Sequence, residues 1–138
     1  MCVFCEIVSG NIPSHKIYED EKTLAILDIT PSAPGHTMVI PKEHCEDLMD
    51  LPVDMASSLL DSVQKVTKML EVGLGRDNFT IGVNSGKIVG RHVEHLHVHI
   101  IPRFKGDGGE YIQGVVSVPL DEPLEEIKRK ILEGNAKH

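Results

Sequence analysis

The chain has 138 residues, 41% hydrophobic and 25% charged, so it has room for one ordinary domain with a sizeable core. Its formal net charge of −7 argues against nucleic acid as a partner. The sequence shows neither an apolar stretch of the roughly 18 residues that a membrane helix needs nor a basic and apolar signal segment. We therefore expect a cytoplasmic protein with no membrane partner.

The N-terminal part predicts one short helix and three strands. Apolar residues at helical spacing favour a helix over residues 2–9, which Gly10 ends. Short, turn-bounded apolar runs predict strands at Lys16–Glu19, Thr23–Ile29 and His36–Pro41.

The clearest helix of the sequence runs from about Pro52 to Leu74. Apolar residues recur along it every three or four positions, Pro52 suits a first turn, and Gly73 with Gly75 ends it. Two strands and a last helix with Asp121 as its N-cap are expected next, the strands at Phe79–Asn84 and Val93–Arg103.

Most of these strands are consecutive and joined by short turns. This order predicts an antiparallel meander of about five strands with helices packed on one face, in the α+β class. No internal repeat or long linker interrupts the chain, so we expect a single domain over residues 1–138.

Eight histidines are the unusual feature of the composition, and three of them alternate with apolar residues in one expected strand. His95, His97 and His99 would share one face of that strand, and the residues between them would face the core. A solvated polar face is one interpretation. The other two are chemical: a metal site with an open position for water, or a nucleophilic imidazole with neighbours that hold phosphate oxygens.

Three cysteines are too few for a disulfide framework. Cys2 and Cys5 form a C-x-x-C pair, which in a reducing compartment indicates metal or redox chemistry. The pair alone does not separate these two interpretations, because tetrahedral zinc needs two further ligands.

The alternating histidines, followed by apolar residues, form the motif after which the histidine triad (HIT) superfamily of nucleotide hydrolases and transferases is named. The chain resembles bacterial and archaeal-type members of this superfamily with a zinc site, over nearly its whole length. The other matching segments occur in the expected order: Phe4-Cys5-Glu6-Ile7, Ile12-Pro13, Tyr18-Glu19-Asp20, Leu27-Asp28-Ile29, Gly35-His36, Val39-Ile40-Pro41-Lys42, His44, Asn84, Gly86, Gly90 and Val93 to Arg103.

The resemblance implies a two-step reaction at the middle histidine. His97 would attack the α-phosphorus of a nucleotide ester, anhydride or phosphoramidate, and water would then release the mononucleotide. His99 would bind phosphate oxygens, and His36 would complete the histidine cluster.

The resemblance also implies the nucleotide-binding residues. Asp28 would accept hydrogen bonds from the ribose hydroxyls, and Asn84 would contact phosphate. Apolar side chains would line the base pocket, among them Phe4, Ile7, Leu27 and Ile29.

Two residues depart from the common pattern of the superfamily, which has glutamine and then serine or threonine after the glycine. Arg91 would bring a permanent positive charge toward phosphate and favour more anionic substrates. His92 would protonate the leaving amine as a general acid. For both residues, a side chain turned to solvent is the alternative.

Zinc-containing members would use four residues that are all present here, Cys2, Cys5, His44 and His95. Such a closed site would be structural and would leave His97 free. Members of the superfamily pair by joining their sheets edge to edge, so a homodimer is expected as well.

The expected function is a hydrolase that releases a nucleoside monophosphate, AMP above all, from purine nucleotide phosphoramidates or adenylylated small molecules. A dinucleoside polyphosphate hydrolase is the alternative within the same chemistry. A non-catalytic nucleotide sensor or zinc-stabilised adaptor is the alternative of another class.

Overall fold

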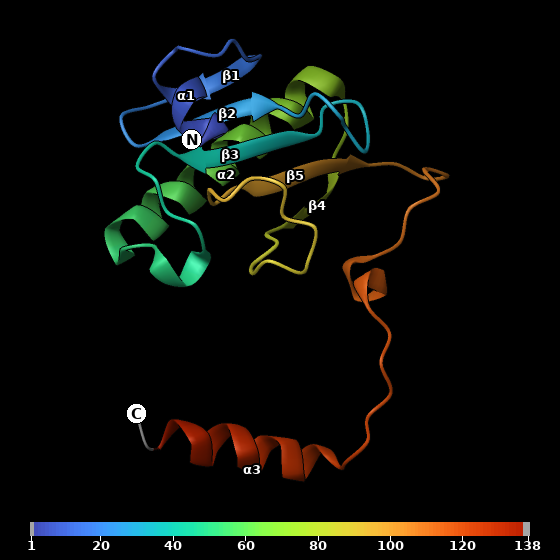
Figure 1. Cartoon of the computed structure of the whole chain (residues 1–138). Coiled ribbons are helices and arrows are strands. Elements are labelled where there is room, and N and C mark those ends of the chain that lie inside the picture. The colour runs from blue at the N-terminus through green and yellow to red at the C-terminus, as the bar shows by residue number, and fades with distance from the viewer. Residues whose placement is uncertain (1, 137–138) are drawn as a thin grey trace. The chain divides into compact units, whose positions relative to one another are not determined.

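The computed structural model describes residues 2–136 of the chain. These residues belong to two compact units, with bounds Met1–Asp107 and Gly108–His138, and each is described by itself. The first unit holds the five strands of the described chain and the two helices that pack on them (Figure 1). The expectation of a single domain over residues 1–138 stays a prediction.

One antiparallel sheet of five strands builds the first unit, so the predicted α+β class is confirmed. The strands are β1 (Lys16–Glu19), β2 (Thr23–Leu27), β3 (Thr37–Pro41), β4 (Asn78–Gly82) and β5 (Val98–Arg103). Their spatial order is β1-β2-β3-β5-β4, so the expected meander ends at β3. β5 lies inside the sheet, and alternate residues of it are buried. β4 forms the edge of the sheet, and none of its residues is fully buried.

The two helices of this unit lie on opposite faces of the sheet, which corrects the expectation of helices on one face. Helix α1 (Val3–Val8) packs on one face, and the long helix α2 (Val53–Leu74) packs on the other (Figure 1). β2 and β3 therefore carry apolar side chains on both faces of the sheet. Leu24, Ile26, Met38 and Ile40 join the cluster of α1, and Ala25 and Val39 join that of α2.

The strand expected at Val93–Arg103 begins only at Val98. Upstream of it, the Leu96 amide donates a hydrogen bond of 2.7 Å to the carbonyl of Cys45, which lies in a loop and not in a strand. The alternation of faces nevertheless continues, because Leu96 joins Val98 and Ile100 in the cluster of α2. The three alternating histidines therefore lie on the opposite face, which α1 covers.

The remaining boundaries of the first unit differ from the prediction by one or two residues. α2 begins after Pro52 and ends at Leu74. Of the two glycines expected to end it, Gly73 lies inside the helix, and Gly75 caps it with a left-handed backbone (φ 68°). β2 ends at Leu27, before the turn that Asp28 begins, and a 3₁₀ turn, η1 (Leu48–Asp50), precedes α2.

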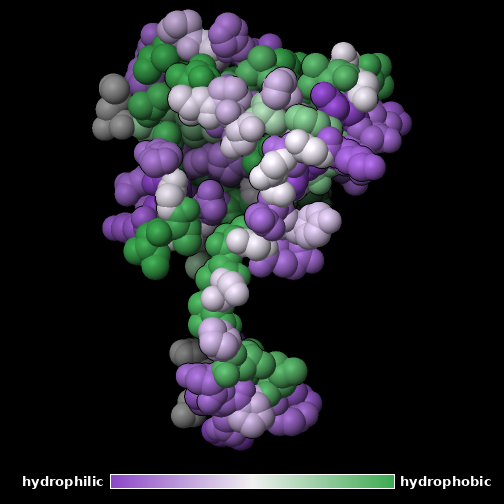
Figure 2. Space-filling view, turned by 90° about the vertical axis from the view of Figure 1, so that its right-hand side faces the viewer, coloured by the Kyte–Doolittle hydropathy of each residue, from purple (hydrophilic) through white to green (hydrophobic). Residues whose placement is uncertain are grey.

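The second unit contains a 3₁₀ turn, η2 (Ile112–Val115), and helix α3 (Leu124–Asn135). Its N-cap is Pro123, not Asp121 as expected, because Pro123 has an extended backbone and the helical turns start after it. Figure 2 shows apolar side chains at the surface. The large exposed ones of this unit are Tyr111, Ile112, Val115, Val116, Val118, Leu120, Leu124, Ile131 and Leu132. Within residues 2–136, no helix is long and apolar enough to cross a membrane.

Candidate functional site

The three alternating histidines lie between the sheet and helix α1. Their neighbour from α1 is Phe4, whose ring stands edge-on to His95 and His97, with centroids 5.8 and 5.2 Å away. The rings of His97 and His99 follow each other at 4.8 Å. His95 and His97 are buried, which excludes the solvated polar face as an interpretation of the motif.

A single hydrogen bond fixes the proton of His97. Its Nδ1 lies 2.7 Å from the carbonyl oxygen of His95. Because a carbonyl oxygen only accepts, Nδ1 must carry the proton, and in the neutral ring Nε2 then holds a free lone pair. The arrangement therefore leaves Nε2 as the atom of His97 that is able to act as a nucleophile.

A chain of hydrogen bonds fixes the protons of the two neighbouring imidazoles in the same way. The amide of Ser32 donates to Nδ1 of His36 at 3.0 Å, so His36 carries its proton on Nε2. That proton is donated to Nδ1 of His99 at 2.9 Å. His99 is left with an N–H at Nε2, which can donate to an anionic oxygen.

The same pair stays uncharged at neutral pH. Burial, with a smaller effect from the neighbouring His97 and His36, lowers the pKa of His99 to about 4. Burial also lowers the pKa of His36, against the opposing effect of Asp28, whose Oδ2 lies 3.6 Å from His36 Nε2. Neutral rings keep the hydrogen-bond directions described above.

A cavity of about 350 Å³ opens beside His97 and His99. Most of the residues that the sequence assigned to nucleotide binding line it, together with His92: Phe4, Ile7, Leu27, Asp28, Ile29 and Asn84. Its walls are mainly apolar, which suits a flat base, and its histidines and Asp28 form the polar end. His36 does not line the cavity and acts on it through His99.

Several lining residues escaped the sequence interpretation: Ile12, Pro13, Ser14, Thr30, Met38, Gly90 and Val93. For Met38 a signal was present, because it lies opposite His99 in the pairing of β3 with β5 and so shares its face. For Val93 the signal was alternation, because it begins the predicted histidine strand and shares the face of His95. The other loop residues gave no such signal, since no local pattern relates them to that strand.

Asp28 sits at the rim of the cavity, directly after β2. Its Oδ1 accepts hydrogen bonds from the amide and hydroxyl of Thr30, at 2.9 and 3.2 Å. These bonds hold the carboxylate in place and leave Oδ2 with only the longer approach to His36. Ile29 beside it is 84% exposed, so it forms an edge of the cavity and not its floor.

Arg91 does not line this cavity. Its side chain is 2% exposed and forms an ion pair with Asp47, and Nη1 also donates to the carbonyl of Glu46 at 3.2 Å. The next residue, His92, is exposed and lines the cavity. Of the two unusual residues, therefore, only His92 faces the space beside His97.

Four potential metal ligands meet at the other end of the histidine segment. The Sγ atoms of Cys2 and Cys5 and the Nδ1 atoms of His44 and His95 all lie within 4.8 Å of one another. The closest pairs are 3.3 to 3.5 Å apart. Nε2 of His95 lies 2.7 Å from the carbonyl oxygen of Pro41 and must donate to it, so Nδ1 of His95 has its lone pair free.

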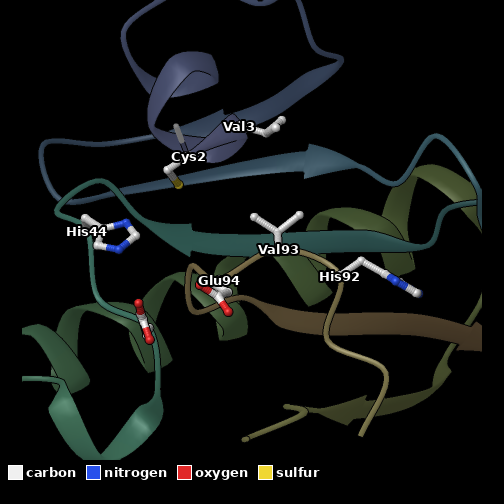
Figure 3. A pocket seen from close by; sticks show the side chains of 7 residues that line it. Cys2, Val3, His44, His92, Val93 and Glu94 are labelled. Atoms are coloured by element: carbon white, nitrogen blue, oxygen red, sulfur yellow. The ribbon is translucent and has the colours of Figure 1, made fainter. Parts of the chain in front are cut away.

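A second cavity, of about 400 Å³, is lined by two members of this cluster, Cys2 and His44. Figure 3 shows Cys2 and His44 at one end of it, Glu94 below, and the His92 side chain extending away from His44. Val3, His92 and Val93 line both cavities, so the metal-ligand cluster and the histidine site are neighbours.

Comparisons with known proteins agree with this geometry. An uncharacterized HIT-like protein from Methanocaldococcus jannaschii is 46% identical over 129 residues, which cover 93% of this chain and 99% of that protein. An adenosine 5′-monophosphoramidase from Schizosaccharomyces pombe is 42% identical over 102 residues, 74% of each chain. The crystal structure of a Zn-bound histidine triad family protein from Mycobacterium smegmatis has a TM-score of 0.73 and 41% identity, and covers 93% of this chain and 88% of that one.

The family model of the HIT domain matches residues 9–106, which include all five strands and the histidine motif. The chain therefore belongs to the HIT family.

Proposed function

We propose that this protein is a nucleotide hydrolase that releases AMP from adenosine phosphoramidates or adenylylated small molecules through a nucleotidyl-histidine intermediate. The hydrogen bond from His97 Nδ1 to the His95 carbonyl carries the proposal, because it leaves Nε2 as the free nucleophile beside the cavity. The similarity to an adenosine 5′-monophosphoramidase supports the choice of substrate class.

In the first step His97 Nε2 forms a bond to the α-phosphorus while the bond from phosphorus to the leaving nitrogen breaks. The leaving amine needs a proton, and His92, at the rim of the cavity, is the residue that we assign to supply it. In the second step water attacks the phosphorus and gives its proton to His92, which the first step left neutral, while the bond to His97 breaks and AMP leaves. The N–H of His99 stabilises the phosphate oxygens in both steps.

The nucleotide is held by the rest of the cavity. The base lies between apolar side chains that include Phe4, Ile7 and Leu27, with Ile29 at the edge. Oδ2 of Asp28 accepts from the ribose hydroxyls, which explains selection for a nucleoside over a simple phosphate. Asn84 contacts the phosphate from the loop that follows β4.

The decisive experiment is a rapid-quench reaction with adenosine phosphoramidate, followed by mass spectrometry of the protein. We expect one AMP bound covalently at His97, a burst of released amine, and loss of turnover by ~10³-fold or more in His97→Asn. His15→Asn, a change of an exposed histidine outside the site, is the matched control. AMP binding without turnover would identify a sensor instead, and preferential cleavage of dinucleoside polyphosphates would identify the alternative hydrolase.

We further propose that Cys2, Cys5, His44 and His95 hold a structural zinc ion. A tetrahedral ion with bonds of about 2.3 Å to sulfur and about 2.0–2.1 Å to nitrogen requires ligand atoms roughly 3.3–3.8 Å apart, and the close pairs here are 3.3 to 3.5 Å apart. The ion would tie α1 to the segment that leads to His97. Elemental analysis should find one zinc per chain in the wild type and in His97→Asn, and none in Cys5→Ser.

We also propose a homodimer. β4 is an edge strand with unpaired backbone groups along one side, and the second unit exposes many apolar side chains. Light scattering of the purified protein measures the mass directly, and a monomer at micromolar concentration would contradict this part of the proposal.

A further inference from the structure

The loop between β4 and β5 carries five residues that line the nucleotide cavity: Asn84, Gly90, His92, Val93 and His97. No helix or strand supports residues 83–97 of this connection. Something else must therefore hold Asn84 and His92 at the cavity, because a side chain that acts on phosphate has to be placed to within a fraction of an ångström.

Asp47, in the loop that follows β3, contacts this segment at two places. Its Oδ1 accepts from the amide of Gly86 at 3.1 Å and from the hydroxyl of Ser85 at 3.4 Å, near Asn84. The same oxygen pairs with the guanidinium of Arg91, next to His92. One carboxylate thus binds the loop next to Asn84 and next to His92, two of the residues that line the cavity.

Burial makes this contact a strong constraint. The Arg91 side chain is 2% exposed and that of Asp47 is 24% exposed, so water screens the pair little. Removing Asp47 leaves the buried guanidinium of Arg91 without a counter-charge, which costs far more than losing an exposed ion pair. Nη1 also donates to the Glu46 carbonyl, so this one nitrogen ties the Arg91 side chain to both residue 46 and residue 47.

We propose that the Asp47–Arg91 pair is a positioning device for the proposed hydrolysis: it holds Asn84 and His92 at the cavity and makes no contact with the substrate itself. The inference rests on the proposed function. It replaces the expectation from the sequence that Arg91 brings its charge to phosphate, because that charge is turned away from the cavity and neutralised by Asp47.

The two roles predict opposite results for changes at Asp47. If Arg91 positions the loop, Asp47→Asn and Arg91→Gln both lower kcat by about 10- to 100-fold, and the double variant is no worse than either single one. If Arg91 bound phosphate, Asp47→Asn would free the guanidinium and preserve or raise activity. Arg91→Gln would then act mainly on dinucleoside polyphosphates, which carry more charge.

The experiment is a double-mutant cycle of Asp47→Asn and Arg91→Gln, with kcat measured on adenosine phosphoramidate and on a dinucleoside polyphosphate. AMP affinity is measured in parallel by calorimetry. Because the base and ribose contacts lie outside the loop, we expect AMP affinity to change by less than about threefold. Lys87→Gln removes an exposed positive charge from the same loop and is the matched control.

Hydrogen exchange gives a measurement that does not need turnover. The Gly86 amide, bonded to Asp47, should exchange at least about tenfold faster in both single variants, while amides of β2 and β3 keep their protection. An additive cycle, or a selective loss on the more anionic substrate, overturns the positioning role. A wild type without turnover but with this exchange pattern would contradict the proposed function and leave the loop assignment standing.

Discussion

Gly35 precedes His36, and replacing it with alanine should destabilise the protein strongly. Its φ is +92°, a backbone conformation that residues with a side chain rarely adopt. A Cβ atom at this position would lie 2.4 Å from Cδ1 of Leu74 and 3.1 Å from Cγ of Pro102. The variant therefore combines backbone strain with a steric overlap.

The two contributions can be estimated separately. The left-handed conformation costs a residue with a Cβ about 1–2 kcal/mol, and overpacking a well-packed site costs about 1–3 kcal/mol. Leu74 is 48% exposed and can move aside, whereas the Pro102 ring is buried within β5 and cannot. We expect Gly35→Ala to lower the free energy of unfolding by about 2–5 kcal/mol.

Urea unfolding of four proteins tests this estimate: the wild type, Gly35→Ala, Gly10→Ala, and Gly35→Ala combined with Leu74→Ala. Gly10→Ala is the matched control, because Gly10 has a φ of +84° with no atom within 4 Å of the added Cβ, so it reports the backbone cost alone. The difference between the two variants then measures the overlap, and it should shrink when Leu74→Ala is added to Gly35→Ala. If Gly35→Ala and Gly10→Ala unfold at the same urea concentration, the steric argument is wrong.

Two further predictions concern pH. The unfolded chain protonates His99 near its ordinary pKa of 6.5, while the folded protein keeps it neutral down to about 4, so the unfolded state binds more protons between these values. The free energy of unfolding should fall by about 2 kcal/mol from pH 7 to pH 5, and urea titrations should show a smaller decrease in His99→Asn. Equal decreases in the two proteins would contradict the neutral state of His36 and His99. Burial opposes ionisation of Asp20, but hydrogen bonds from the amides of Lys22 and Thr23 and the hydroxyls of Tyr18 and Thr23 outweigh it and lower its pKa from 3.8 to about 2. The ionised form of Asp20 therefore stabilises the fold above pH 3.8, and this effect is lost as the pH falls through 2. Asp20→Asn should lower the free energy of unfolding by about 1–2 kcal/mol at pH 7, a figure reduced by partial exposure, and by almost nothing at pH 2. A loss of stability that does not change with pH would refute the assignment.

Local patterns in the sequence were enough to predict the elements and the shared face of the three histidines. Every helix and strand of the first unit was predicted, because periodicity and turn residues act over a few positions. Alternation along residues 95–99 placed the histidines on one face, even where the strand itself had not begun. The resemblance to the HIT family then supplied roles for residues that are far apart in the chain.

The sequence by itself determined which side chains face together along a strand, because that depends only on alternation between neighbouring residues. Tertiary structure alone decided that β5 enters between β3 and β4, that α1 and α2 cover opposite faces, and that Arg91 turns to Asp47. Each of these depends on competition among distant surfaces for burial and among distant charges for a partner. No short stretch of the sequence contains both of the surfaces, or both of the charges, that compete.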